Sequence, residues 1–272
     1  MKLDTLSMRI RKWSPLIQAA LLPLAFVIGV GSFVLVASGK SKPNKPAPQG
    51  PPPSILMVGD SLCVGKFGEV LQVHLAQKYP VAAYASCGSS PEHWVSGQQD
   101  FITKCGYRQR TIDSDVFRDF VNGRSPRPTL TPKLTKLINK HKPTILIVQL
   151  GTNWMDRGLS DAQMSDYLDR FVREARRGSV QEIIWIAPPD SSRLRRTQGR
   201  VHGLIRQAAR RDGFQVIDSR EVTRYVVGKT GGDGIHYNNE ASEAWARRIQ
   251  GDLYSKLSRG IRERKFSRLK GS

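Results

Sequence analysis

The 272-residue sequence lacks the common signatures of metal and nucleotide chemistry. It has three cysteines and five histidines, with no Cys or His pairs at the spacing of a metal site. It contains neither a Gly-x-Gly-x-x-Gly fingerprint nor a phosphate-binding loop. The Gly-x-Ser-x-Gly elbow of the α/β-hydrolase fold is absent as well. We therefore expect no cofactor and no bound metal, and the α/β-hydrolase fold is disfavoured.

Acidic residues are few: 23 Asp and Glu stand against 43 Lys and Arg, which gives a formal net charge of +20. Residues 1–53 and residues 256–272 each hold seven basic residues and one acidic residue, so each end carries a net charge of +6. A basic excess that lies largely outside the core argues against a nucleic-acid partner. Basic tails are more typical of solubility, or of contact with anionic lipid or polymer.

Charge is missing altogether from Ser14 to Ser38, a run of 25 mainly apolar residues. A bilayer needs about 20 such residues, so we expect a transmembrane signal anchor at residues 14–38. The basic residues 1–13 favour a cytoplasmic N-terminus, which places the rest of the chain on the periplasmic or extracellular face. A secretory signal cleaved at Val36-Ala37-Ser38 is the alternative, and it exports the chain too. The proline-rich residues 39–53 are typical of a semi-rigid tether.

Residues 54–258 alternate between strand-like and helix-like patterns. The strand-like runs lie at residues 55–58, 81–85, 144–150, 182–187 and 214–217, and the last helical pattern covers residues 239–258. This alternation predicts one α/β domain with a parallel sheet covered by helices on both faces. Residues 89–129 lack clear periodicity, and we interpret them as an inserted loop region with short helical pieces. A basic tail follows at residues 259–272.

Four short segments follow predicted strands or precede the last helix. They are Gly59-Asp60-Ser61, Cys87-Gly88, Gly151-Thr152-Asn153 and Asp233-Gly234-Ile235-His236. Because the carboxyl ends of parallel strands open on the same edge of a sheet, these segments can converge there. Each has an ordinary interpretation when taken alone: Ser61 suits a helix N-cap, and a single histidine is usually a satisfied surface or core residue. Their order along the chain favours a common site.

In order and spacing the four segments resemble those of the SGNH or GDSL hydrolase superfamily. The third block of that superfamily is usually Gly-x-Asn-Asp, and Trp154 stands here in place of the Asp. The resemblance covers about residues 54–258 and implies a flavodoxin-like three-layer sandwich with a five-stranded parallel sheet. It implies Ser61, Asp233 and His236 as catalytic residues, and Ser61, Gly88 and Asn153 as the oxyanion hole.

Acyl-transfer chemistry explains why these residue types are needed. A serine hydroxyl is a poor nucleophile until a neighbouring base takes its proton, which is the role expected of His236. Asp233 would accept the second imidazole N–H and stabilise the imidazolium as it forms. The oxyanion needs fixed donors, here the backbone N–H groups of Ser61 and Gly88 and the side-chain amide of Asn153.

Cysteines and aromatic residues add further candidates. An exported domain can form a disulfide, and a Cys87–Cys105 bridge would brace the Gly88 amide, with unpaired thiols as the alternative. Cys63 is expected to be a small buried filler. Trp154 and Tyr237 are candidate substrate-binding residues, although packing around loops explains such aromatics as well.

We therefore expect a membrane-anchored, exported serine esterase that cleaves or transfers a small acyl group, such as acetyl, on an envelope glycan or lipid. Hydrolysis and acyl transfer share the acyl-enzyme step and differ in whether water or an acceptor hydroxyl resolves it. The alternative is a non-catalytic module of the same fold that binds an anionic envelope polymer. The complete set of Ser61, Asn153, Asp233 and His236 favours the enzyme, since a binding module needs no nucleophile with its base.

Overall fold

The structure is a computed structural model that describes residues 53–270, with the backbone alone for residues 262–270. The expected anchor at residues 14–38, and all but the last residue of the expected tether, lie outside the described residues. Within residues 53–270, no helix is long and apolar enough to cross a membrane.

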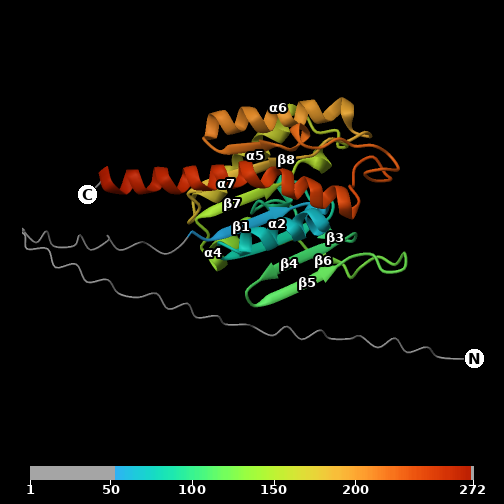
Figure 1. The fold of residues 1–272 in the computed structure, drawn as a ribbon, viewed down its shortest axis with the longest axis horizontal. Coiled ribbons are helices and arrows are strands. Elements are labelled where there is room, and N and C mark those ends of the chain that lie inside the picture. Colours follow the sequence, from blue (N-terminus) through green and yellow to red (C-terminus); the bar gives the residue numbers. More distant parts are fainter. Residues whose placement is uncertain (1–52, 271–272) are drawn as a thin grey trace, which may run out of the picture. The chain divides into compact units, whose positions relative to one another are not determined.

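Five parallel strands form most of a seven-stranded sheet (Figure 1). They stand in the spatial order β2, β1, β7, β8 and β9, with the bounds Val81–Ser86, Ile55–Gly59, Ile145–Gln149, Glu182–Ala187 and Gln215–Asp218. The five predicted strands are all present, but the sheet is larger than predicted. Because β1 is the central strand of the seven, its last residue, Gly59, lies beside both Ala85 of β2 and Gln149 of β7.

The two additional strands come from the segment 89–129. β4 (Tyr107–Thr111) pairs antiparallel with β2 and with β5 (Ser114–Arg118), which forms the edge of the sheet. A second antiparallel pair, β3 (Ile102–Thr103) and β6 (Thr129–Leu130), brings the two ends of the hairpin segment together.

The expectation of an irregular loop with short helical pieces is therefore wrong where these strands form, at residues 102–103, 107–111, 114–118 and 129. The one helical piece described there is the single turn α3 (Pro91–Trp94). The hydropathy pattern does not predict this hairpin, because the side chains from Arg108 onward in β4 are polar and only partly buried. The strand therefore has no apolar face. Pairing with β2, rather than a hydrophobic alternation, forms these strands.

Helices cover both faces of the sheet in three layers. One face is covered by α1 (Ser61–Val64), α2 (Lys66–Ala76) and α7 (Asn239–Lys270), and the other by α4 (Leu134–His141), α5 (Asp161–Arg176) and α6 (Arg195–Asp212). The central strand contributes to both cores, since Ile55 and Met57 pack toward the first set while Leu56 and Val58 pack toward the second. Burying each such side chain contributes about 1.5–3 kcal/mol. The site-bearing turns therefore stand on a rigid, fully buried strand.

Candidate active site

Ser61 is presented by the sharp turn between β1 and α1. Asp60 is the N-cap of α1, and its Oδ1 accepts the Leu62 N–H at 3.0 Å. The N-cap interpretation of Ser61 is wrong, because Asp60 fills that position and Ser61 is the first helical residue. A Cβ added to Gly59 would lie 2.4 Å from the Cβ of Cys63, so glycine is needed for the helix to begin this close to the strand. Cys63 itself is buried, as predicted.

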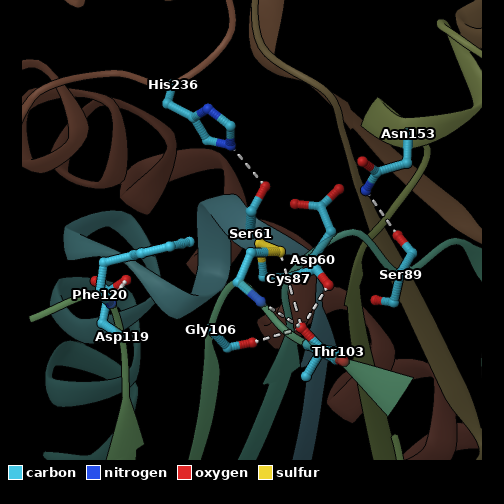
Figure 2. The surroundings of a disulfide bond; sticks show 12 residues. Asp60, Ser61, Cys87, Ser89, Thr103, Gly106, Asp119, Phe120, Asn153 and His236 are labelled. Atoms are coloured by element: carbon cyan, nitrogen blue, oxygen red, sulfur yellow. Dashed lines mark hydrogen bonds between the residues drawn. A yellow bond between two sulfur atoms is a disulfide. The ribbon is translucent and has the colours of Figure 1, made fainter. Parts of the chain in front are cut away.

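Asp60 lies buried beneath the serine turn, on the side that faces Asn153 (Figure 2). Burial raises the pKa of Asp60 to about 6, although the hydrogen bond from the Leu62 N–H and the charge of His236 oppose the rise. The carboxyl group therefore belongs to the floor of the site, and its hydrogen bond to Leu62 fixes the direction in which Ser61 points.

His236 and Asp233 reach Ser61 from the loop between β9 and α7. His236 Nε2 lies 2.9 Å from Ser61 Oγ, and His236 Nδ1 lies 2.6 Å from Asp233 Oδ2 (Figure 2 shows the first contact). Asp233 Oδ1 also accepts the backbone N–H groups of Ile235 and His236, at 2.8 and 2.7 Å. Burial alone would raise the pKa of Asp233, but the hydrogen bonds from His236 and Ile235 hold it at about 2. A charged carboxylate thus faces the imidazole over the working pH range.

The loop that carries this pair is held by a buried tyrosine. Tyr225 donates its hydroxyl to the carbonyl of His236 at 3.0 Å and accepts the Gly234 N–H at 3.0 Å. Gly234 adopts a left-handed φ of +86°, and a Cβ there would lie 2.7 Å from the Cβ of Arg193. The turn between Asp233 and His236 therefore depends on a glycine and on Tyr225, a residue that the sequence analysis did not single out.

Asn153, an expected oxyanion donor, lies on the side of Ser61 away from His236 and is bonded to Ser89, the residue after Gly88 (Figure 2). Among the described residues, neither the Ser61 N–H nor the Gly88 N–H has a hydrogen-bond acceptor. Gly88 has a φ of +79°, a conformation that side chains disfavour. Asn153 Nδ2 donates to the carbonyl of Ser89 at 2.8 Å, which leaves its second N–H for a ligand (Figure 2).

The turn that contains Gly88 is braced from below. Cys87 and Cys105 form a disulfide with a Cα–Cα distance of 5.6 Å. The Cys87 N–H donates to the Gly106 carbonyl at 2.9 Å, and the Thr103 hydroxyl donates to the Cys87 carbonyl at 2.8 Å (Figure 2). The insert thus holds the end of β2 in place next to the serine.

Neither aromatic candidate offers its polar group to a substrate. The expectation for Trp154 is wrong: the residue is 1% exposed, and its indole N–H donates to Glu92 Oε2 at 2.8 Å. Tyr237 is half-buried, donates its hydroxyl to the carbonyl of Asp190 at 2.6 Å and packs edge-on against Tyr225. Trp154 belongs to the hydrophobic core, so packing explains this residue. The hydroxyl of Tyr237 is already used by its hydrogen bond to Asp190.

An aromatic residue of the insert approaches the site instead. Phe120 follows β5 and is 50% exposed, and in Figure 2 its side chain points toward Ser61 and Cys87. The loop after β5 leaves from the same end of the domain as the loop before α7 (Figure 1). No sequence signal points to Phe120, because its position depends on the antiparallel pairing of β4 and β5. Within the described part of the chain, no cluster of His, Cys, Asp and Glu could hold a metal ion.

The fold and this site define a class of protein. The model of the GDSL-like lipase/acylhydrolase family matches residues 57–244, which include all four segments, and the chain belongs to this family. No curated protein matches the chain.

Several solved structures are similar in fold, among them TesA and Est24. TesA is 19% identical with a TM-score of 0.50, and the match covers 74% of this chain and 97% of TesA. Est24, described as a carbohydrate acetylesterase from Sinorhizobium meliloti, is 13% identical with a TM-score of 0.52, over 75% of this chain and 99% of Est24. At these identities the likeness concerns the fold.

Proposed function

We propose that this chain is a serine esterase in which Ser61 is the nucleophile, His236 the general base and Asp233 its partner. The supporting observation is the continuous hydrogen-bonded chain from Ser61 Oγ through the imidazole to the Asp233 carboxylate, at 2.9 and 2.6 Å. Both distances are within the range for proton transfer between a nucleophile and its base.

The proposed reaction proceeds in two halves. Ser61 Oγ attacks the ester carbonyl carbon while His236 Nε2 takes the hydroxyl proton. The tetrahedral intermediate then expels the alcohol, which receives that proton, and the acyl group stays on Ser61. Water or an acceptor hydroxyl, deprotonated by His236, attacks the acyl carbon of the acyl-enzyme. The second tetrahedral intermediate expels Ser61 Oγ, which takes the proton back from His236, and the acyl group leaves as the acid or as the new ester. Asp233, held ionised, stabilises the imidazolium in both halves.

In this mechanism the negative oxygen of each tetrahedral intermediate is stabilised by the N–H groups of Ser61 and Gly88 and the free N–H of Asn153. Their lack of an acceptor among the described residues supports this role, because a donor already in use could not respond to the developing charge. Each such donor contributes about 2.7–4 kcal/mol to transition-state stabilisation.

For the substrate we propose a small acyl ester, such as an acetyl ester, on an envelope glycan or lipid. Residues 14–38 would anchor the protein with residues 54–258 on the outer face of the membrane, and their apolar composition supports this arrangement. The carbohydrate acetylesterase described for the similar fold of Est24 supports the acyl group by analogy of fold alone.

A fluorophosphonate probe tests the proposed nucleophile directly, since it phosphonylates only an activated serine. We expect labelling of the full chain and none of Ser61→Ala, with the adduct on the peptide that contains Ser61. Ser192→Ala is a matched control, because Ser192 is also partly buried and lies outside the proposed machinery. Absence of labelling in a folded wild-type protein would refute the esterase and favour a binding module.

Product analysis separates hydrolysis from acyl transfer. Incubation with an acetylated glycan in the presence of a second, unacetylated glycan gives free acetate if water resolves the acyl-enzyme. Transfer instead moves the acetyl group to the second glycan without release of acetate.

A further inference from the structure

The expected oxyanion donors come from two segments that are far apart in the sequence, and something must hold those segments in register. Gly88 stands at the end of β2, whereas Asn153 belongs to the 3₁₀ turn η1 (Thr152–Trp154) after β7. Their direct link is the hydrogen bond from Asn153 Nδ2 to the Ser89 carbonyl. One bond through a rotatable side chain cannot fix both the position and the orientation of the amide.

A buried carboxylate provides a second link immediately behind the first. Glu92, in α3 and four residues after Gly88, accepts the indole N–H of Trp154 at 2.8 Å. It also accepts the guanidinium of Arg157, and its side chain is only 10% exposed. Trp154 directly follows Asn153, so Glu92 ties the segment that carries Gly88 to the turn that carries Asn153.

The helix that bears Glu92 is itself fixed on both sides. At the start of its single turn the Ser90 N–H donates to His93 Nδ1 at 2.9 Å, and the His93 N–H donates to the Ser90 carbonyl at 3.0 Å. Lys133 donates to the His93 carbonyl at 3.2 Å, and Trp94 Nε1 donates to Ser89 Oγ at 3.1 Å. A four-residue helix is not stable on its own. These contacts therefore hold the backbone of α3, and with it Glu92, in place.

Glu92 also gives a reason for the departure of this chain from its family pattern. The usual Gly-x-Asn-Asp block has a carboxylate after the asparagine, whereas Trp154 presents an N–H donor there. The matching acceptor stands opposite, in the other segment. The Trp154 N–H and the Glu92 carboxylate, which are 62 residues apart in the sequence, thus connect the segment that carries Asn153 to the segment that carries Gly88.

We propose that Glu92 is a positioning residue that holds the Gly88 and Asn153 donors at the separation that an oxyanion requires. It does so through Trp154 and Arg157 and touches neither the substrate nor the proton-transfer residues. This role rests on the proposed function, because only an acyl-transfer site needs the two donors in register.

Three variants of the full chain test this role. Glu92→Gln removes the charge that holds Arg157, and Trp154→Phe removes the indole N–H while keeping a smaller aromatic ring. Glu174→Gln is the matched control, since Glu174 likewise accepts the Ser96 N–H and the Thr135 N–H and so links neighbouring segments without a contact to either donor.

With p-nitrophenyl acetate as the substrate, we expect Glu92→Gln to lower kcat about 100-fold with KM changed less than about threefold, since a misplacement of about 1 Å costs this much. Trp154→Phe should lower kcat about tenfold, because Arg157 still holds the carboxylate. The pH dependence of kcat should be unchanged in both. Glu174→Gln should keep the wild-type kcat.

Hydrogen–deuterium exchange supplies a readout that does not depend on activity. In Glu92→Gln, exchange should rise together in residues 88–95 and 151–157, and Glu174→Gln should not reproduce this pattern. An unchanged kcat, or faster exchange in one segment alone, would overturn the role of Glu92. An inactive wild type would refute the proposed function, and the exchange measurement would still decide whether Glu92 couples the two segments.

Discussion

The two halves of the candidate site are built in opposite ways. The half proposed for proton transfer is open, with the side chains of His236 and Asp233 49% and 47% exposed. The half proposed for the oxyanion stands on a buried network, in which the side chain of Glu92 is 10% exposed and Trp154 is 1% exposed. A base must exchange protons with its surroundings, whereas a donor is useful only when it is held where charge develops.

The two halves are also held rigid by different kinds of contact. The exposed pair is fixed locally, by the Gly234 turn and the Tyr225 hydroxyl within the same loop. The buried half is fixed by contacts between distant segments, including the Cys87–Cys105 disulfide and the Glu92 link. Changes in the first half should therefore affect chemistry alone, and changes in the second should affect chemistry and stability together.

The largest effect is expected from His236→Gln, which removes the base from the open half. In a serine enzyme the loss of the base lowers kcat by about 10⁶-fold. Because the side chain is half exposed, the free energy of unfolding should change by less than about 0.5 kcal/mol. Steady-state kinetics with p-nitrophenyl acetate and urea unfolding measure the two quantities. A variant that keeps a tenth of the wild-type kcat would remove His236 from the mechanism.

Asn153→Ala removes the one expected oxyanion donor that belongs to a side chain. We expect kcat to fall about 100- to 1,000-fold, the usual cost of one oxyanion donor, with KM little changed. The lost hydrogen bond to Ser89 should also lower the unfolding free energy by about 1 kcal/mol. An equal rate in the variant and the wild type would show that Asn153 does not contact the intermediate.

Replacing both Cys87 and Cys105 with serine removes the covalent brace of the buried half. The disulfide closes a loop with a sequence separation of 18, so its removal should lower the unfolding free energy by about 3 kcal/mol. Urea unfolding of the oxidised protein, the reduced protein and the double variant measures the effect. Identical unfolding midpoints for all three samples would contradict it, and the reduced wild type controls for the substitutions.

Asp60 lies between the two halves and gives a pH dependence with a definite sign. Its pKa is raised by burial from 3.8 to about 6, so the protonated carboxyl stabilises the folded state fully below about pH 3.8, and this stability is lost as the pH rises to about 6. The loss amounts to about 3 kcal/mol. Asp60→Asn, which keeps an oxygen for the Leu62 N–H, should abolish this part of the slope. Urea unfolding at a series of pH values from 4 to 7 compares the two proteins, and parallel curves would contradict the assignment.

The smallest effect is expected from Phe120→Ala, because Phe120 belongs to the insert rather than to either half. If its ring lies against the bound ester, KM should rise about three- to tenfold with kcat unchanged, for the loss of about 1 kcal/mol of apolar contact. Phe117→Ala is the control, since Phe117 is 54% exposed on the same hairpin and packs on Arg108. The same KM in all three proteins would exclude a contact of Phe120 with the ester.

The central sheet could be predicted because its strands carry their own signal. Residues 55–58 and 145–148 are apolar without interruption, and Gly59 and Gly151 follow these runs closely, so the positions of Ser61 and Asn153 follow from local sequence. The hairpin of β4 and β5 could not be predicted in this way, since its side chains are polar or half-buried and its pairing with β2 is not local.

The supporting residues of the site were missed for the same reason. Glu92 looks like one more charged residue in an irregular segment, and its partner Trp154 lies 62 residues away. Tyr225 acts on Gly234 and His236 through its hydroxyl, which no periodicity reveals. Residues that do chemistry have recognisable types and spacings, whereas residues that hold them in place are defined by contacts between segments.

The direction of β1 has a practical consequence for handling the protein. The chain enters β1 at Ile55 and reaches Ser61 only after crossing the sheet, while α7 starts beside the site and runs back for 32 residues, about 48 Å of helix. The first and last described residues therefore both lie at the end of the domain opposite Ser61 (Figure 1). A fusion partner or affinity tag attached directly at residue 53 or residue 270 will therefore lie at the end of the domain opposite Ser61.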